Sequence, residues 1–339
     1  MTNQLSDEEL KYRQSKQKNL ENIFKSFEKP IDFIWIGKNS RRRLVLQVDN
    51  NHNFGFFHEK SHKLNIIDNY EIAEQSINQL LPYLNKFLKN ISTKTLSQIV
   101  ITSFDNGLDL VFRYCESPTS QDEMQLINFA KSHNLVLSLQ INSSIFPIYL
   151  PRKNQIYCGD YKLIVDSDIF IQATKRGLEI IVNFLQKTLE KNLAKKIAEL
   201  YCGCGIYSFN LLNLNRQFDC FEGSESMIEI LKNNLKNFNI NHKISPFVRD
   251  LFVDPLSVKE LNSYDNIIIN PPRNGAGPQI ANIAKSQVKY VQYISCNPDS
   301  LVRDAKIMID TKYNIVNIIA LDQFYFTKHH EVLMSFERK

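Results

Sequence analysis

Residues 196–206 read Lys-Ile-Ala-Glu-Leu-Tyr-Cys-Gly-Cys-Gly-Ile, and this stretch decides the fold class. An apolar run ends at Tyr201 and is followed by Gly203, Gly205 and a helical segment that begins at Ile206. This order predicts a buried strand, a sharp turn that leaves room for a ligand, and a helix. The full Gly-x-Gly-x-x-Gly fingerprint of dinucleotide sites is missing, so a tight structural turn without a ligand remains an alternative.

Five more apolar, β-rich runs follow this turn and alternate with helical segments. They occupy residues 218–221, 266–269, 288–294, 316–321 and 332–336. Short apolar runs between helices indicate strands that are buried on both faces of a mostly parallel sheet. No helix precedes the last run, so we expect it to enter the sheet as an antiparallel strand. The second half of the chain is thus predicted to be a doubly wound α/β domain, in which ligands bind at the carboxyl ends of the strands.

Two acidic residues stand at the predicted ends of the next two strands. Glu222 lies about twenty positions beyond the glycine turn, where an acidic residue commonly binds ribose hydroxyls. Asp250 follows the next strand candidate, at a place suited to an adenine amino group. Each carboxylate alone is equally compatible with an ordinary surface position. Their order along the chain favours a nucleotide-like ligand.

Polar segments also close the fourth and fifth predicted strands. In Asn270-Pro-Pro-Arg273 the two prolines force the chain out of the sheet, although a plain strand terminator is the alternative interpretation. Cys296 follows the fifth strand in Ser295-Cys-Asn-Pro298 and precedes a helix. A helix N-terminus favours the thiolate, whereas a lone cysteine is most often a small buried apolar group.

The segment from Asp322 to Glu331 precedes the last strand and brings titratable groups to the same edge of the sheet. Besides these two carboxylates it contains His329 and His330. Carboxylates and imidazoles both serve as general bases. Spacing alone does not choose between Glu331 and the histidines, and an aromatic-rich loop that only packs on the sheet is the structural alternative.

The first half of the chain has a mixed pattern. Ser6-Asp-Glu-Glu9 is typical of a capping box and predicts a helix towards Phe27 that ends before Pro30. Strand-like stretches occur at 33–37, 43–48, 98–103 and 108–114, and helical stretches at 72–90 and 121–132. They predict an α+β substrate domain. We therefore expect a helical segment over 1–30, the α+β domain over 31–158 and the doubly wound domain over 159–339.

Composition places the 339-residue chain among ordinary globular proteins, with 43% hydrophobic and 23% charged residues. No apolar run approaches the ~20 residues that span a bilayer, and no signal pattern opens the chain, so we expect a cytoplasmic protein. The six cysteines are scattered, which argues against a disulfide framework. Cys202-Gly-Cys204 has no second pair of ligands nearby, so no metal site is expected.

The formal net charge of +5 is a modest basic excess, and part of it is clustered. The clustered cations are Lys38, Arg41, Arg42, Arg43, Lys60 and Lys63, and they flank the aromatic segment 54–58. Basic side chains bind phosphate groups and aromatic rings stack on unpaired bases, so this cluster is compatible with RNA binding. A solvated basic edge of a small sheet explains the same pattern equally well.

Taken together, the motifs resemble the RNA 5-methyluridine (uracil-C5) methyltransferase family in order and spacing across about residues 169–336. The segment Ser295-Cys-Asn-Pro-x-x-Leu-x-Arg-Asp304 is highly specific, and Asp322-x-Phe-x-x-Thr-x-His-x-Glu331 moderately so. A weaker likeness in Arg41-Arg-Arg-Leu-Val45 and in residues 55–63 is similar to the ribosomal-RNA branches more than to the transfer-RNA branch. The resemblance implies a Rossmann-like class I methyltransferase domain preceded by a smaller α+β domain. It also implies S-adenosyl-L-methionine as cofactor, RNA as partner and a monomer.

The resemblance also implies roles for individual residues. Cys296 would be the nucleophile that adds to C6 of the uracil, and Glu331 the base that removes the C5 proton. The implied cofactor residues are Gln172, Glu199, Tyr201, Gly203, Gly205, Glu222, Asp250 and Asn270. The implied substrate residues are Asn270, Arg273, Asn297 and His329. The target uracil would have to be unstacked and extruded from its RNA fold.

The chain departs from the family pattern at several points. Asn270 stands where the family usually has aspartate, so a charge near the target is lost. No cysteine precedes Cys115, and Tyr70 lies near the place of one cluster cysteine, so we predict that the iron–sulfur cluster of many relatives is absent. The substrate domain begins near Ile31, which leaves no room for an additional N-terminal RNA-binding barrel. Tyr325 replaces a common proline.

Three other functions compete with uracil-C5 methylation of ribosomal RNA. The target RNA could instead be transfer RNA. Asn270-Pro-Pro is also found in enzymes that methylate exocyclic amines, but those require an aromatic residue where Arg273 stands, and they leave Cys296 and Glu331 without a role. The third alternative is a non-catalytic RNA-binding or assembly protein of the same fold.

Overall fold

The computed structural model describes residues 6–58, 61, 63–212, 216–327 and 329–339. The chain folds into two compact units. The C-terminal unit consists of Met1–Ile36 together with Arg176–Lys339, and the central unit is Gly37–Lys175. Each unit has its own sheet and its own hydrophobic core.

Among the described residues, the C-terminal unit contains an eight-stranded sheet. Its strands, in spatial order, are β1 (Asp32–Trp35), β16 (Tyr313–Asp322), β17 (Glu331–Arg338), β15 (Tyr290–Ser295), β14 (Asn266–Ile269), β11 (Lys196–Leu200), β12 (Gln217–Glu222) and β13 (Ile244–Val248). Neighbouring strands are parallel except where β17 lies between β15 and β16 and runs antiparallel to both. The predicted antiparallel insertion of the last strand is confirmed.

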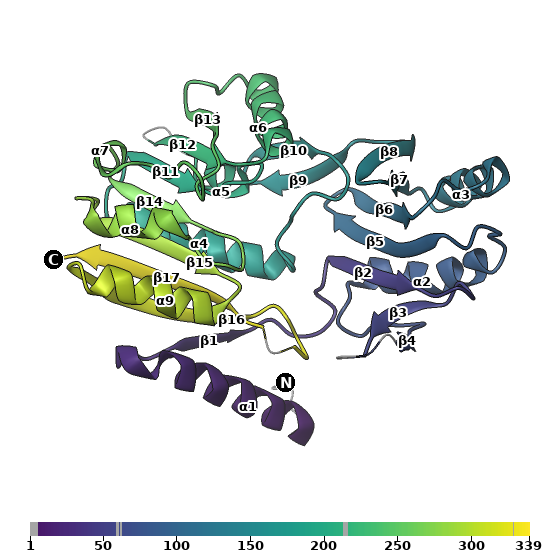
Figure 1. Cartoon of the computed structure of the whole chain (residues 1–339), viewed down its shortest axis with the longest axis horizontal. Coiled ribbons are helices and arrows are strands. Elements are labelled where there is room, and N and C mark those ends of the chain that lie inside the picture. Colours follow the sequence, from purple (N-terminus) through teal and green to yellow (C-terminus); the bar gives the residue numbers. More distant parts are fainter. Residues whose placement is uncertain (1–5, 59–60, 62, 213–215, 328) are drawn as a thin grey trace. The chain divides into compact units, whose positions relative to one another are not determined.

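Helices lie on both faces of this sheet, as the doubly wound pattern predicts. They are α1 (Asp7–Phe24), α4 (Lys175–Lys191), α5 (Ile206–Leu211), α6 (Glu225–Phe238), α7 (Val258–Leu261), α8 (Pro278–Lys285) and α9 (Pro298–Ile309). Figure 1 shows α8 and α9 in front of the sheet and α4 behind it. This arrangement brings the carboxyl ends of the parallel strands to one edge, where the loops that carry the predicted site residues begin.

The first described elements, α1 and β1, pack with the last strands in the C-terminal unit. Ser6 caps α1, because its side chain accepts a hydrogen bond from the Glu9 N–H at 3.2 Å. Leu20 and Phe24 of α1 are buried in the core of the C-terminal unit, and β1 pairs with β16. Figure 1 shows these first elements in purple beside the yellow C-terminal strands. The described part of the segment over 1–30, which the sequence predicted as a separate helical segment, therefore belongs to the C-terminal unit.

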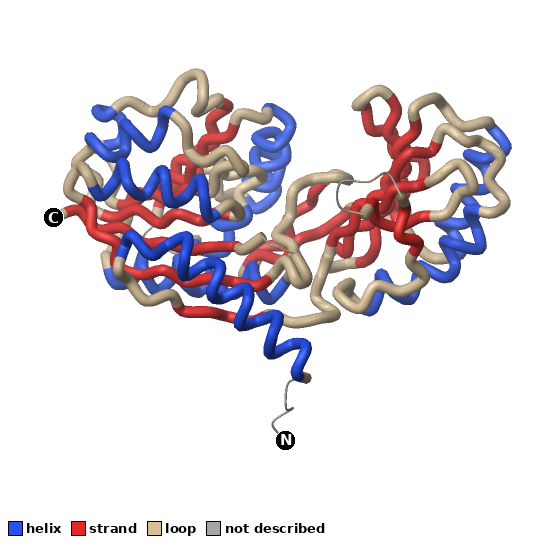
Figure 2. The backbone as a smooth tube through the Cα atoms, turned by 60° about the horizontal axis from the view of Figure 1, so that its bottom comes forward, coloured by secondary structure: helices blue, strands red, loops and turns tan. Residues whose placement is uncertain are grey.

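The central unit is an α+β domain, as predicted. Its described sheet has the order β4 (Leu64–Ile66), β3 (Phe54–Phe57), β2 (Arg43–Val48), β5 (Leu96–Phe104), β6 (Gly107–Tyr114), β7 (Val136–Ile141) and β8 (Ser144–Tyr149). Two helices, α2 (Gln75–Leu88) and α3 (Ser120–Ser132), contribute to its core, and β9 (Asn154–Cys158) and β10 (Tyr161–Val165) form a hairpin. Figure 2 distinguishes these strands, in red, from the helices, in blue.

The boundary after the central unit lies later in the chain than the predicted residue 158. The unit extends to Lys175 because the segment after β10 is tied to its sheet. Asp168 accepts hydrogen bonds from Arg43 at 2.5 Å and from Arg113 at 2.6 Å, and Ser167 donates to Asp109 at 2.6 Å. These buried or half-buried polar contacts are invisible to a composition-based division.

Candidate active site

The turn after β11 has the backbone that the glycine pattern predicts. Tyr201, Gly203 and Gly205 have φ angles of 59°, 56° and 81°. A Cβ on Gly205 would lie 2.8 Å from the Cδ1 atom of Leu231, so a side chain there would collide with α6. At Gly203 no atom lies within 4 Å of the corresponding position. The turn therefore leaves open space beside Gly203, where the backbone can approach a ligand closely.

Two carboxylates adjoin this turn from the neighbouring strands. Glu222 ends β12 and accepts hydrogen bonds from the N–H groups of Gly203 and Ser224, each at 3.0 Å. Asp250 follows β13 and accepts one from the Phe252 N–H at 2.9 Å. Since β11, β12 and β13 are adjacent, these groups form one continuous edge. Carboxylate oxygens accept more than one hydrogen bond, so this edge fits the hydroxyl and amino groups of a nucleoside.

Glu199 occupies a different place from the other predicted cofactor residues. It is fully buried within β11 and accepts hydrogen bonds from the Ser208 N–H at 3.0 Å and from the Ser208 hydroxyl. Burial raises the pKa of Glu199 to about 7. Its Oε1 atom has no hydrogen-bond partner in the part of the chain that the structure describes. The observed contacts hold α5 against β11, and a direct contact with the cofactor stays a prediction.

The loops after β14 and β15 bring three predicted substrate residues towards the same edge. The backbone N–H of Asn270 donates to the Leu200 carbonyl at 3.2 Å, which holds Asn270 beside the end of β11. The Asn297 side chain caps α9 and donates from Nδ2 to the Arg273 carbonyl at 2.8 Å. Asn270, Arg273 and Asn297 thus come from two loops that are joined by a direct hydrogen bond.

Asp304 of α9 stabilises the loop between β14 and α8. Its buried carboxylate accepts hydrogen bonds from the Ala276 N–H at 2.7 Å and from the Tyr293 hydroxyl at 2.6 Å. Arg303 donates to Asp304 at 3.0 Å and to the Asn274 carbonyl at 2.6 Å. The sequence motif contains Arg303 and Asp304, and the structure shows that they support the loop between β14 and α8.

We expect Asp304→Ala to lower the free energy of unfolding by about 2–4 kcal/mol, because it leaves the Tyr293 hydroxyl and the Ala276 N–H buried without an acceptor. Chemical denaturation followed by circular dichroism measures this change. Asp310→Ala, at the exposed C-cap of the same helix, is the matched control and should stay within about 0.5 kcal/mol of the parent protein. Equal losses in the two variants would contradict the supporting role of Asp304.

Cys296 lies at the end of β15, opposite the start of β17. The antiparallel register pairs Ser295 with Val332, so the next position brings Cys296 opposite Glu331. Cys296 is half-buried. Burial and the Glu331 carboxylate raise the pKa of the Cys296 thiol, and Arg273 opposes this shift. Glu331 and Arg273, from two other sequence motifs, therefore both act on the Cys296 thiol.

Glu331 is 3% exposed and accepts a hydrogen bond from Nε2 of Gln323 at 2.7 Å. Burial raises the pKa of the Glu331 carboxyl to about 8, although the Gln323 hydrogen bond works in the opposite direction. A carboxyl group with a pKa near the working pH can both hold and release a proton, which suits a general base.

The two neighbouring histidines differ from Glu331. His330 is buried, and burial, Lys16 and His329 lower the pKa of its imidazole to about 4. His329 is half-buried, its backbone N–H donates to the Thr327 hydroxyl at 3.2 Å, and its ring meets Phe324 edge-on. Unlike the two histidines, Glu331 begins β17 and stands one position beyond the Ser295–Val332 pair, on the side of Cys296.

Sequence reasoning missed two residues of α1 that contact Asp322, at the start of the segment before Glu331. Lys16 donates to the Asp322 carboxylate, and the Tyr12 hydroxyl donates to the same group at 3.0 Å. Lys16 and Asp322 are 306 positions apart in the chain. No local pattern signals a contact over such a separation.

Gln172 and the basic cluster belong to the central unit, and Gln172 is buried there. Arg42 is 3% exposed and donates to the Ser103 carbonyl at 3.0 Å, and Arg43 pairs with Asp168. The arginines therefore stabilise the central unit rather than forming the free basic edge that we considered. Lys38 and Lys63 are exposed, whereas Lys60 lies outside the described residues.

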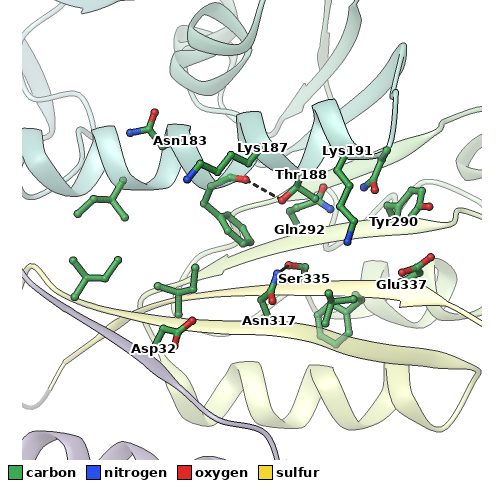
Figure 3. Close-up of a pocket in the computed structure, with 17 residues that line it drawn as sticks. Asp32, Asn183, Lys187, Thr188, Lys191, Tyr290, Gln292, Asn317, Ser335 and Glu337 are labelled. Carbon is green, nitrogen blue, oxygen red and sulfur yellow. Dashed lines mark hydrogen bonds between the residues drawn. The ribbon is translucent and has the colours of Figure 1, made fainter.

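A cavity of about 400 Å³ in the C-terminal unit is separate from these residues. Figure 3 shows Asn183, Lys187 and Lys191 of α4 on one side of it, and Asn317 and Ser335 of the sheet on the other. None of the predicted site residues lines this cavity.

Within the described residues, no group of three or more His, Cys, Asp or Glu side chains is placed to hold a metal ion. No helix of the described chain has the length and apolar character of a membrane span.

Comparisons with known proteins identify the family of the chain. Residues 8–339 match the model of the tRNA (uracil-5-)-methyltransferase family. A 23S rRNA (uracil(1939)-C(5))-methyltransferase of Haemophilus influenzae (strain 86-028NP) is 30% identical over 310 residues, which cover 90% of this chain and 68% of that protein. An uncharacterized RNA methyltransferase of Mesorhizobium japonicum is 28% identical over 96% of this chain and 79% of its own length.

A solved structure shares the fold of most of the chain. It is the tRNA (uracil-54, C5)-methyltransferase of Pyrococcus abyssi in complex with S-adenosyl-L-homocysteine, with a TM-score of 0.78 and 20% identity. The match covers 95% of this chain and 82% of that one.

The sheet order, the glycine turn and its carboxylates define a class I methyltransferase that uses S-adenosyl-L-methionine. The chain belongs to the tRNA (uracil-5-)-methyltransferase family and is an RNA (uracil-C5) methyltransferase. The exocyclic-amine alternative therefore has no support.

Proposed function

We propose that this enzyme methylates C5 of a uracil in ribosomal RNA through a covalent intermediate on Cys296, with Glu331 as the base. The observation that carries the proposal is the register of β15 and β17, which pairs Ser295 with Val332 and so leads to Cys296 and Glu331 at the next position. The two side chains come from separate sequence motifs. The influence of Glu331 on the pKa of Cys296 supports a common task.

The chemistry requires a nucleophile and a base at this place. The Cys296 thiolate adds to C6 of the uracil, which gives C5 the electron density of an enolate. The cofactor supplies the methyl group to C5. Glu331 then removes the C5 proton, the electron pair restores the C5–C6 double bond, and the thiolate leaves. Burial and Glu331 raise the pKa of Cys296, and Arg273 favours the thiolate because it opposes this rise.

The cofactor would lie along the edge formed by the glycine turn. We assign Gly203 and Gly205 to the close approach of backbone and ligand, and Glu222 and Asp250 to hydrogen bonds with its hydroxyl and amino groups. The open space beside Gly203 supports this assignment. Tyr201 donates its hydroxyl hydrogen to the Ala276 carbonyl at 3.0 Å, which links the turn to the substrate loop. Gln172, Glu199 and Asn270 complete the proposed cofactor residues.

Asn270, Arg273, Asn297 and His329 are the residues that we propose for the RNA substrate. An amide at position 270 can accept the uracil N3–H or donate to a carbonyl. Ribosomal RNA is preferred to transfer RNA because several relatives at about 30% identity are named for 23S rRNA. We further propose that the enzyme is a cytoplasmic monomer without an iron–sulfur cluster.

Trapping on fluorinated RNA tests this function. The protein is incubated with S-adenosyl-L-methionine and with ribosomal or transfer RNA that contains 5-fluorouracil. Fluorine cannot leave as a proton, so we expect a stable adduct between ribosomal RNA and the peptide that contains Cys296, detected by denaturing gel and mass spectrometry. An adduct with transfer RNA alone would show that transfer RNA, and not ribosomal RNA, is the substrate. No adduct on either RNA, with the cofactor still bound, would support the non-catalytic alternative.

A further inference from the structure

The N-terminal helix α1 is joined to the loop before Glu331 by a buried ion pair. Lys16 is 6% exposed and Asp322 is 4% exposed, and the Lys16 ammonium donates to the Asp322 carboxylate. Lys16 also donates to the Phe324 carbonyl at 3.1 Å. Charged side chains are rarely buried unless they are paired and hydrogen-bonded, so this contact holds both segments in one defined position.

Tyr12, one turn before Lys16, strengthens the same contact. Its hydroxyl donates to Asp322 at 3.0 Å and accepts hydrogen bonds from the Lys16 ammonium at 3.1 Å and from the Phe326 N–H at 3.0 Å. The Tyr12 ring also packs on Tyr325, with ring centroids 4.9 Å apart. One face of α1 therefore binds residues 322–326 through an ion pair, hydrogen bonds and aromatic packing.

Gln323 lies between the two residues that Lys16 holds, and it serves a different partner. Lys16 contacts the side chain of Asp322 and the backbone carbonyl of Phe324, whereas the Gln323 side chain donates to Glu331 at 2.7 Å. Fixing residues 322 and 324 also fixes the backbone of residue 323. The direction of the Gln323 amide towards Glu331 therefore depends on the contact with α1.

We propose that Lys16 is a positioning residue for the catalytic base: it holds the Asp322–Phe324 segment so that Gln323 hydrogen-bonds Glu331. This inference rests on the proposed role of Glu331. It assigns α1, which lies outside every motif of the family resemblance, a part in the reaction. Tyr12 assists by binding Asp322 and the Phe326 N–H.

Several charged or titratable groups surround Glu331, and they bear on the test. Cys296 follows β15 and faces Glu331, with Arg273 acting on the same thiol. His330 precedes Glu331 in the chain, and Lys16 lies close enough to His330 to lower the pKa of its imidazole. Asp322, on β16, is neutralised by Lys16. The hydrogen bond from Gln323 is the contact that lowers the pKa of Glu331.

The test compares Lys16→Met, Gln323→Leu and the double variant, and it measures kcat for RNA methylation against pH. A hydrogen bond to the ionised carboxylate lowers its pKa. In the plot of kcat against pH, each single variant should therefore raise the midpoint of the limb assigned to Glu331 by about one pH unit. At neutral pH kcat should fall about tenfold, with KM for S-adenosyl-L-methionine unchanged. Lys18→Met, on an exposed position of the same helix, is the matched control and should leave the limb in place.

The double variant separates positioning from a general effect on the fold. If Lys16 acts through Gln323, the limb of the double variant coincides with that of Gln323→Leu. Additive shifts, or an unshifted limb in Lys16→Met, would overturn the proposal. Should Lys16→Met fail to fold, Tyr12→Phe keeps the ring but removes the hydroxyl that binds Asp322, and a smaller upward shift is expected; no shift would count against the proposal.

A readout without turnover distinguishes this inference from the proposed function. The Glu331 carboxyl is titrated by NMR in protein that carries ¹³Cδ-glutamate, with Glu331→Gln used for assignment. Lys16→Met should raise the observed pKa of Glu331 by about one unit even if no RNA is methylated. An unchanged titration would refute the positioning role, whereas inactivity of the parent protein on all RNA would refute only the proposed function.

Discussion

Cys296→Ala is expected to lower the rate of RNA methylation by ~10³-fold or more, because the uracil ring is not activated without a nucleophile at C6. Binding of S-adenosyl-L-methionine should remain within about twofold, since the cofactor edge lies at the ends of other strands. Transfer of a tritiated methyl group to RNA measures the rate, and isothermal titration calorimetry measures cofactor binding.

Cys115→Ala is the matched control for this experiment, because Cys115 is the exposed cysteine of the central unit. We expect its methylation rate to equal that of the parent protein. The four remaining cysteines are buried, and burial raises the pKa of Cys202, Cys204 and Cys220. Retention of more than a tenth of the activity in Cys296→Ala would exclude the covalent mechanism.

Glu331→Gln is expected to slow product release from the enzyme by ~10²–10⁴-fold, the range that general bases contribute. The variant keeps the nucleophile, so the methylated RNA should remain bound to Cys296 when its C5 proton is not removed. A protein–RNA band that survives denaturing electrophoresis with unmodified RNA, and that requires the cofactor, would establish this state. Glu337→Gln, on the same strand at a less buried position, should give no such band.

The dependence on pH gives the same residue a second test. Burial raises the pKa of Glu331 from its usual 4.5 to about 8, and the base works in its ionised form. The rate of the parent enzyme should therefore fall as the pH drops through about 8, rather than through 4.5. The residual rate of Glu331→Gln should lack this limb. A parent enzyme with a flat profile between pH 6 and 9 would show that Glu331 is not the base.

Much of the C-terminal unit was predictable because its signals are local. The predicted strands at 197–201, 218–221 and 266–269 agree with β11, β12 and β14 to within one residue at each end. Apolar runs of this kind are buried wherever the sheet forms, so neighbouring residues suffice to reveal them. The prediction for the central unit was less complete, because β3, β4, β7, β8, β9 and β10 were not among the predicted strands. Their burial follows no common pattern: four successive residues are buried in β7, none is buried in β8, and buried residues alternate with less buried ones in β9 and β10.

The candidate site shows the same division. Cys296, Glu331 and the glycine turn were found from motifs, whereas the support of the loops by Asp304, Gln323 and Lys16 was found only in the structure. Glu199 illustrates the limit of a motif, because its observed hydrogen bonds go to Ser208. A motif records which residue types recur together, but it does not state which atoms they contact.

By itself, the sequence determined the fold class, the antiparallel last strand and the strand ends at which chemistry would take place, since hydrophobic periodicity and turn chemistry act over a few residues. The tertiary structure decided the rest. It placed α1 and β1 in the C-terminal unit, set Glu331 opposite Cys296, and buried Lys16 against Asp322. These outcomes depend on pairing between segments that are distant in the chain and on the removal of charges from water, and both are properties of the packed molecule.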